Sequence, residues 1–256
     1  MPEVRPKKHL GQHFLNDKRV AQRITESLRA DGCDAVLEIG PGMGVLTFDL
    51  YQRFGSRLVA VEVDSESVSY LKRNLPDLKV VEADFLQVDV KELLKGQFAV
   101  IGNLPYNISS QIFFRVIEQR DFVPEVVAMV QREVAQRIAE KPGSRTYGIL
   151  SVLLQAFYNI EYLFTVSEGC FTPPPKVKSA VIRLTRNSVN DLGCSYTLFE
   201  RVVKAAFNQR RKTLRNSIRS AFNGIEISDK YGTKRAEQLS VDNFVELTLE
   251  VERLLG

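Results

Sequence analysis

Short apolar segments alternate with amphipathic segments over the first two-thirds of the chain. Valine, isoleucine and leucine gather without polar alternation at Ala35–Ile39, Arg57–Val63, Leu78–Glu82, Phe98–Gly102 and Val126–Gln131. Such runs are typical of strands that are buried on both faces. The intervening stretches Val45–Phe54, Ser65–Asn74 and Ser110–Arg120 have helical spacing. The pattern predicts an α/β fold in which helices cover a parallel sheet.

Two further strands are expected, near Ile160–Val166 and at Ser179–Thr185. The connection between them contains the proline-rich run Thr172-Pro173-Pro174-Pro175-Lys176 and is too short for a βαβ crossover. These two strands are therefore expected to pair antiparallel, outside the proline run. The result is a Rossmann-like sheet of seven strands, the last of them antiparallel.

The pattern becomes purely helical after the turn-rich segment 187–193. Helices are expected at Tyr196–Asn208, at Lys212–Phe222, and from an N-cap at Ser240 to Leu255. We therefore expect two domains. Residues 1–187 form the sheet domain with its N-terminal arm, and residues 188–256 form a small all-α domain.

Composition narrows the class of protein. The 256 residues are 44% apolar and 26% charged, which is typical of a packed soluble chain. No run approaches the roughly 20 apolar residues of a membrane helix, and no apolar signal-peptide core follows the basic N-terminus. We expect a cytoplasmic protein without a membrane partner. Three scattered cysteines, and a His9–His13 pair without further ligands, indicate neither a disulfide framework nor a metal site.

A glycine-rich turn follows the first predicted strand, in Glu38-Ile39-Gly40-Pro41-Gly42-Met43-Gly44. Glycines here permit a sharp bend and a close approach of the backbone to a ligand. The G-x-G-x-G spacing differs from the dinucleotide fingerprint. Glu62 ends the second strand, 22 residues after Gly40, where a carboxylate can accept hydrogen bonds from ribose hydroxyls.

Each of these features also has a structural interpretation. The glycines could form a tight turn, Glu62 could be a solvated strand end, and Asp84, just after the third strand, could cap a helix. Their joint placement at one edge of the sheet favours an adenosine-bearing ligand.

The run Asn103-Leu104-Pro105-Tyr106 follows the fourth strand, at the sheet edge where doubly wound enzymes do chemistry. Asn103 offers a carbonyl acceptor, and Leu104 precedes proline, which favours an extended backbone with an exposed carbonyl. Tyr106 offers a face for base stacking. Two acceptors would favour the pyramidal form of a planar adenine amino group, whose lone pair could then attack a methyl group. The alternative is a proline turn that merely starts the next helix.

These motifs resemble those of the ribosomal RNA adenine dimethyltransferases. The resemblance rests on the glycine loop, the Asn103–Tyr106 run, Lys8-His9-Leu10-Gly11-Gln12-His13-Phe14-Leu15, the proline loop that follows Phe171, and Arg210-Arg211-Lys212-Thr213-Leu214. It covers Lys7 to about Leu255 and is closest to the bacterial small-subunit (KsgA-type) family. That family methylates two adjacent adenines in a hairpin near the 3′ end of small-subunit rRNA.

The resemblance implies S-adenosylmethionine as cofactor and specific roles for residues. The implied cofactor contacts are His13, Leu15, Gly40, Gly42, Glu62, Asp84 and Asn103. Asn103, Leu104 and Pro105 would hold the target amino group, Tyr106 would stack on the base, and Phe171 would form a second aromatic wall. His13 departs from the asparagine that is usual in the family. In one interpretation, His13 can still donate one hydrogen bond to the cofactor. In the other, it is only a bulky substitution in a mobile arm.

The segment from Arg201 to Arg219 contains seven basic residues and no acidic one. Arg211, Arg215 and Arg219 recur at every fourth position and so share one helix face. Such a face is often merely solvated, but the lack of acids favours a phosphate-binding surface. The predicted RNA-binding residues are Arg132, Arg137, Arg210, Arg211, Lys212, Arg215 and Arg219.

The expected partner is small-subunit rRNA within an assembling small ribosomal subunit, and the expected state is a monomer. Three alternatives are weighed. The related large-subunit enzymes tend to have isoleucine in place of Leu104 and a different proline loop. A non-catalytic assembly or transcription factor is disfavoured by the intact Asn103–Tyr106 run, and a NAD-dependent dehydrogenase by the glycine spacing.

Overall fold

The structure is a computed structural model that describes residues 4–7 and 10–256. Lys8 and His9, which contribute to the family resemblance and to the question of a metal site, lie outside the described residues. The chain divides into two compact units, Met1–Ala135 with Asn159–Arg186, and Gln136–Tyr158 with Asn187–Gly256. Each unit is described by itself.

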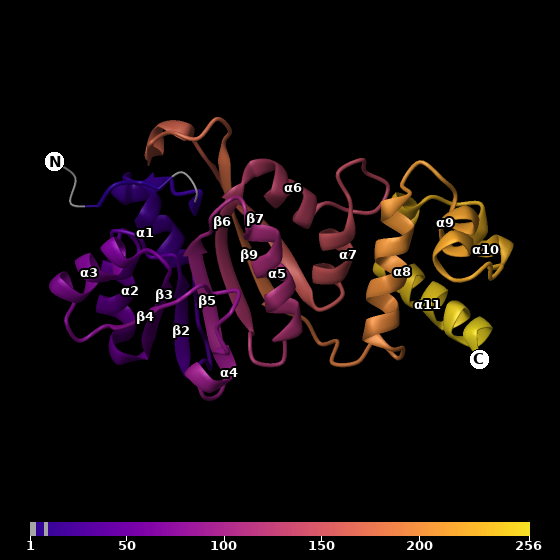
Figure 1. Ribbon diagram of the computed structural model, residues 1–256, viewed down its shortest axis with the longest axis horizontal. Coiled ribbons are helices and arrows are strands. Elements are labelled where there is room, and N and C mark those ends of the chain that lie inside the picture. The colour runs from indigo at the N-terminus through magenta and orange to yellow at the C-terminus, as the bar shows by residue number, and fades with distance from the viewer. Residues whose placement is uncertain (1–3, 8–9) are drawn as a thin grey trace. The chain divides into compact units, whose positions relative to one another are not determined.

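The first unit contains a seven-stranded sheet in the order β4-β3-β2-β5-β6-β9-β7 (Figure 1). Five neighbouring strands are parallel, and β9 pairs antiparallel with β6. The predicted sheet with an antiparallel last strand is confirmed. The strands are β2 (Ala35–Ile39), β3 (Leu58–Glu62), β4 (Lys79–Glu82), β5 (Phe98–Asn103), β6 (Glu125–Gln131), β7 (Tyr158–Val166) and β9 (Ser179–Arg186).

Burial explains why the central strands lack alternation. Every residue of β3 is buried, as is every residue of β2 except Ala35. Side chains of α1 (Lys18–Ser27) and α2 (Thr47–Phe54) join a core that includes residues of β2, β3, β5 and β6. The edge strand β4 has no fully buried residue. The remaining elements of this unit are η2 (Gly55–Arg57), α3 (Ser65–Asn74), α4 (Val90–Leu93), α5 (Ser109–Glu118) and η3 (Glu168–Cys170).

A two-stranded sheet joins the N-terminal arm to the segment before the proline loop. In β1 (Phe14–Leu15) and β8 (Phe171–Thr172), Phe14 pairs with Thr172 and Leu15 with Phe171. The amide of Asn16 adds a hydrogen bond to the Cys170 carbonyl at 2.8 Å. Sequence reasoning missed this pairing, because two residues are too few to show a period.

The second unit is helical. Its helices are α7 (Ile149–Gln155), α8 (Tyr196–Asn208), α9 (Leu214–Ala221), α10 (Asp229–Gly232), η4 (Ala236–Gln238) and α11 (Val241–Leu255), while α6 (Arg132–Ala139) runs across the division between the units. The predicted N-cap Ser240 accepts a hydrogen bond from the Asn243 amide at 3.2 Å. Across the described ranges, no helix is long and apolar enough to cross a membrane.

The predicted boundary at residue 187 coincides with one boundary between the units. The predicted first domain, however, also contained residues 136–158, which the structure groups with the C-terminal helices. The reason is the apolar helix α7, in which Leu150 through Leu154 are buried and which packs against α8 and α11.

Candidate active site

A cavity opens where the order of the strands reverses. From β2 the chain continues to β3 on one side, whereas β5 pairs with β2 on the other. The carboxyl ends of the strands at such a switch point form a natural ligand crevice. The cavity is lined by residues 10–15 of the arm, Glu38, residues 40–43, Val45, Leu46, Glu62, Val63 and residues 103–106.

The predicted glycine loop forms one wall of this cavity. Gly40 and Gly42 have φ angles of +66° and +54°, in the left-handed region that favours glycine. A Cβ atom on Gly42 would lie 2.9 Å from the ring of Phe14. The loop and the arm therefore approach each other as closely as a residue without a side chain allows.

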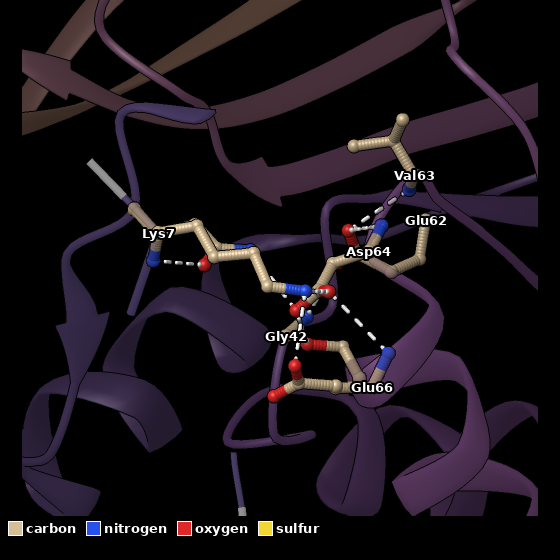
Figure 2. Close-up of polar contacts among 8 residues, drawn as sticks. Lys7, Gly42, Glu62, Val63, Asp64 and Glu66 are labelled. Carbon is tan, nitrogen blue, oxygen red and sulfur yellow. Dashed lines mark hydrogen bonds and ion pairs between the residues drawn. The ribbon is translucent and has the colours of Figure 1, made fainter. Parts of the chain in front are cut away.

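Glu62 ends β3 beside this loop (Figure 2). Its side chain is almost completely buried, and it accepts hydrogen bonds from the amides of Gly42 at 3.0 Å and of Val63 and Asp64 at 2.9 Å each. Burial raises the pKa of Glu62, and these amide bonds oppose that shift. Oε1 accepts two of these bonds and Oε2 accepts one, so Oε2 can still accept another hydrogen bond, as ribose recognition would require.

Asp64 anchors the arm to the same strand end (Figure 2). Its carboxylate is fully buried, forms an ion pair with Lys7, and accepts from Gln12 Nε2 at 3.4 Å and Ser67 Oγ at 2.9 Å. It also caps α3 through the Glu66 amide. Burial alone would raise the pKa of Asp64, but the bonds from Lys7, Ser67 and Gln12 outweigh it and lower that pKa.

Sequence reasoning singled out neither Lys7 nor Asp64. Asp64 carries an N-cap signal before α3, but no spacing connects it with Lys7, 57 residues away. The contact arises from the path of the arm.

Glu38 is a further carboxylate that sequence reasoning did not assign. It lines the cavity, is 1% exposed, and its Oε2 is buried without a hydrogen-bond partner among the described residues. Burial, with the charge of Glu62 adding to it, raises the pKa of Glu38 to about 8. An acid within the apolar strand Ala-Val-Leu-Glu-Ile was the signal that could have revealed it.

Asn103 has an orientation that its surroundings determine. Its Nδ2 donates to the backbone carbonyl of His13 at 3.0 Å. Because a carbonyl can only accept, the amino half of the Asn103 amide faces the arm. Its Oδ1 is then the atom available to accept a hydrogen bond from a ligand.

Tyr106 is held from two sides. Its hydroxyl lies 2.5 Å from Ser179 Oγ, and its ring stacks on the His13 imidazole with centroids 5.4 Å apart and planes at 28°. Burial raises the pKa of the Tyr106 hydroxyl. The imidazole is fixed in turn, since His13 Nδ1 lies 2.8 Å from the Pro173 carbonyl and must carry the hydrogen in that contact.

The structure brings most of the predicted site residues together, but not all. His13, Leu15, Gly40, Gly42, Glu62 and the run Asn103–Tyr106 line one cavity. Asp84 is exposed beyond it at the end of β4, where its Oδ1 accepts from the Leu86 amide at 2.9 Å.

Phe171 does not form the predicted second aromatic wall. It is 3% exposed, pairs with Leu15 and packs into the core. It therefore lines neither this cavity nor the second cavity, between the arm and the proline loop, that is described next. The aromatic ring beside Tyr106 is that of His13.

A second cavity adjoins the first in the same unit. It is lined by Pro6, residues 11–13, Tyr106, Gln131 and the proline loop from Thr172 to Val177. Four residues, Gly11, Gln12, His13 and Tyr106, line both cavities and so form the boundary between them.

The basic segment of the second unit is less uniform than the sequence indicated. Arg210 lies 3.8 Å from Glu237, Arg219 lies 3.7 Å from Glu226, and Arg215 pairs with Asp229. These acids lie outside the segment 201–219, so inspection of that segment could not find them. Arg211 and Lys212 are exposed, and the described part of the chain offers them no ion-pair partner.

The other two predicted RNA contacts lie on α6, where Arg132 is exposed and Arg137 is partly buried. No cluster of three metal-ligating side chains occurs within residues 4–7 and 10–256.

Comparison with known proteins identifies similar sequences over the whole chain. The family described as "Ribosomal RNA adenine dimethylase" matches residues 4–252. A protein of Parabacteroides distasonis named ribosomal RNA small subunit methyltransferase A is 58% identical over 251 residues, covering 96% of this chain and 94% of the relative. A Bacteroides thetaiotaomicron protein of the same name is 55% identical over 262 residues, covering 100% and 97%.

Solved structures share the fold at lower identity. A dimethyladenosine transferase from Plasmodium falciparum superposes with a TM-score of 0.80 at 23% identity, covering 94% of this chain and 98% of that one. The 23S rRNA methyltransferase ErmE superposes with a TM-score of 0.68 at 24% identity, covering 93% and 99%.

The raised pKa of Glu38 predicts a pH-dependent stability. In the unfolded chain this carboxyl ionises near its ordinary pKa of 4.5, whereas the folded protein keeps its proton up to about 8. Stability should therefore fall as pH rises from about 5 to 8, by on the order of 1 kcal/mol per pH unit from this group. Glu38→Gln mimics the protonated acid and should flatten the curve, measured by urea unfolding at pH 5, 6.5 and 8. Equal slopes for both proteins would contradict a protonated Glu38.

The Lys7–Asp64 ion pair predicts how firmly the arm is held. Lys7→Met removes the cationic partner of a buried carboxylate and should release residues 10–16 from the cavity. Hydrogen exchange of a peptide covering these residues should become several-fold faster. Lys18→Met, at an exposed lysine just beyond the arm, is the matched control and should leave that exchange unchanged. Unaltered exchange in Lys7→Met would show that the strand pairing alone holds the arm.

Proposed function

This chain belongs to the ribosomal RNA adenine dimethylase family, and we propose that it dimethylates two adjacent adenosines in a hairpin near the 3′ end of small-subunit rRNA. It is an rRNA adenine dimethyltransferase, and its methyl donor is S-adenosylmethionine. The family resemblance drawn from the motifs is thereby confirmed. The choice of the two adenosines, a link to subunit maturation, and the roles of individual residues form our proposal.

The cavity suits S-adenosylmethionine, which carries a ribose, an adenine and a cationic amino acid portion. Gly40 and Gly42 let the backbone approach the ligand closely, and Glu62 offers its Oε2 for a ribose hydroxyl. Glu38 adds a buried oxygen without a partner among the described residues, which a cationic or hydrogen-bonding ligand group would satisfy. His13 and Leu15 close the cavity from the arm. We propose that Asp84, which is exposed outside the cavity at the end of β4, contacts the adenine of the bound cofactor. When bound, this cofactor supplies an electrophilic methyl group.

The orientation of Asn103 is the observation that carries the proposed chemistry. With Nδ2 committed to the His13 carbonyl, Oδ1 can accept a hydrogen bond from the amino group of the target adenine. The backbone carbonyl of Leu104, which precedes proline, is the second acceptor. Two acceptors favour the pyramidal nitrogen, whose lone pair then points away from the ring. The nitrogen loses its proton to water after it becomes cationic, so positioning and electrostatics suffice.

Tyr106 positions the base. Its ring is oriented by Ser179 through the hydroxyl and covered on one face by His13, which leaves the opposite face to stack on adenine. Such stacking contributes roughly 1–3 kcal/mol per base, which helps to offset the cost of extruding the adenosine from its stack.

The RNA-binding surface is proposed to include Arg132 and Arg137 on α6 and the basic segment of the second unit. Within that segment Arg211 and Lys212 are the strongest candidates, because the arginines at 210, 215 and 219 are already paired with acids. We propose that the protein acts as a monomer in the cytoplasm on the assembling small subunit.

Methyl transfer from labelled S-adenosylmethionine to unmethylated small-subunit particles tests this function. The wild type should form dimethyladenosine, and Asn103→Ala should lower the rate by about 10²–10³-fold, the usual effect of removing a positioned electrostatic partner. Asn74→Ala is the matched control, since Asn74 also donates to a backbone carbonyl, that of Tyr70 at 2.8 Å, but within α3. Full activity of a folded Asn103→Ala protein would overturn the catalytic assignment.

The pairing of the arginines predicts a ranking among RNA contacts. Arg211→Gln with Lys212→Gln should weaken particle binding about tenfold and reduce the slope of log affinity against log salt by about 1–2. Arg215→Gln with Arg219→Gln should have a smaller effect on binding, because these side chains are engaged by Asp229 and Glu226. Filter binding at several salt concentrations measures both. If the two double variants lost equal binding affinity, the paired and unpaired basic residues would contribute equally to RNA binding, as the sequence indicated.

A further inference from the structure

The second cavity has no role in the function proposed so far. It lies within the first unit, between the arm and the proline loop, and Tyr106 and His13 separate it from the catalytic cavity. Two contacts hold this partition. The two rings stack on each other, and the imidazole is hydrogen-bonded to the Pro173 carbonyl on the second-cavity side.

The lining of this cavity suits an apolar, planar ligand beside a negative charge. Pro173, Pro174 and Pro175 supply ring surfaces, and Val177 is 45% exposed, unusually high for a large apolar side chain beside a cavity. Gln131, at the end of β6, also lines the cavity, and its carboxamide can both donate and accept hydrogen bonds. Among the described residues that line it, none is acidic.

Two lysines lie in or next to the segment that lines this cavity, where they can attract a phosphate group. Lys176 belongs to the lining, and Lys178 is exposed two residues further along the same segment. A nucleotide combines a flat base that stacks on apolar rings with a phosphate that such lysines attract. The cofactor is a less suitable occupant, because its cationic portion would meet lysine instead of carboxylate.

We propose that this second cavity binds the base of the nucleotide that adjoins the target adenosine. The inference rests on the proposed function, since it needs a single strand that has one base in the catalytic cavity. Consecutive nucleotides then place their bases on opposite sides of the His13–Tyr106 partition. Gln131 bonds the edge of the neighbouring base, and Lys176 contacts the phosphate. For a substrate with two adjacent adenosines, the second cavity holds one adenosine while the other reacts.

A double-mutant cycle between protein and RNA tests this site. The protein change is Val177→Asn, which places an uncharged polar group at the cavity, and the RNA change is an abasic nucleotide on either side of the target adenosine in the hairpin. Affinity is measured by fluorescence polarisation with S-adenosylhomocysteine present. Each single change should weaken binding about tenfold, and the two together should weaken it scarcely further, because both remove one interaction.

Phe122→Asn is the matched control, since Phe122 is 36% exposed in the same unit but lines neither cavity. Its effect should be the same with intact and abasic RNA. Val177→Ala, which only trims the side chain, repeats the cycle in case the polar variant does not fold. Coupling at one of the two neighbouring nucleotides supports the site. Independent, multiplying losses at both, or no loss from either Val177 variant, overturn it.

Methyl transfer to the same hairpin separates the two hypotheses. If the wild type methylates the hairpin but the cycle shows no coupling, only the second-cavity assignment fails. If the wild type neither binds the hairpin nor methylates unmethylated small-subunit particles, the proposed function itself fails.

Discussion

The parallel pairing of β2 with β3 on one side and β5 on the other is the constraint on which the site depends. It brings three strand ends to one edge, so that the glycine loop, Glu62 and Asn103 surround one cavity although they are far apart in the sequence. The ends of β2 and β5 lie so close together that a Cβ atom on Gly102 would be 2.5 Å from the carbonyl oxygen of Ile39. Hydrogen bonds between these buried strands set the positions of the strand ends, and with them the positions of the residues that line the cavity.

Three carboxyl groups are buried at this edge, and each is stabilised differently. Glu38 keeps its proton, Glu62 is solvated by backbone amides, and Asp64 is neutralised by Lys7 of the arm. Burying a charge without partners costs much free energy. Glu38 avoids this cost by protonation, Glu62 by hydrogen bonds, and Asp64 by an ion pair. The third solution has a structural consequence, because it ties the arm that carries His13 and Leu15 across the cavity.

The same arm links the cofactor side of the site to the base side. The His13 backbone orients Asn103, while the His13 ring stacks on Tyr106 and is bonded to the proline loop. A histidine where relatives usually have asparagine therefore does more than preserve one hydrogen bond. Its ring stacks on Tyr106, whereas Phe171 is buried in the core, and His13 lies at the boundary between the two cavities.

The sequence by itself determined the sheet, its helices, the glycine loop with the acid Glu62 at the end of the next strand, and the Asn103–Tyr106 run. Strand burial and turn chemistry leave local patterns of apolar residues and glycines, and reactive motifs are contiguous. Only the tertiary structure decided which distant groups meet: Lys7 with Asp64, His13 with Tyr106, and Arg215 with Asp229. It also showed that Phe171 is core and that residues 136–158 pack with the C-terminal helices. These contacts depend on the path of the chain between elements, which no local periodicity encodes, because an ion pair or a ring stack requires proximity in space and not spacing in sequence.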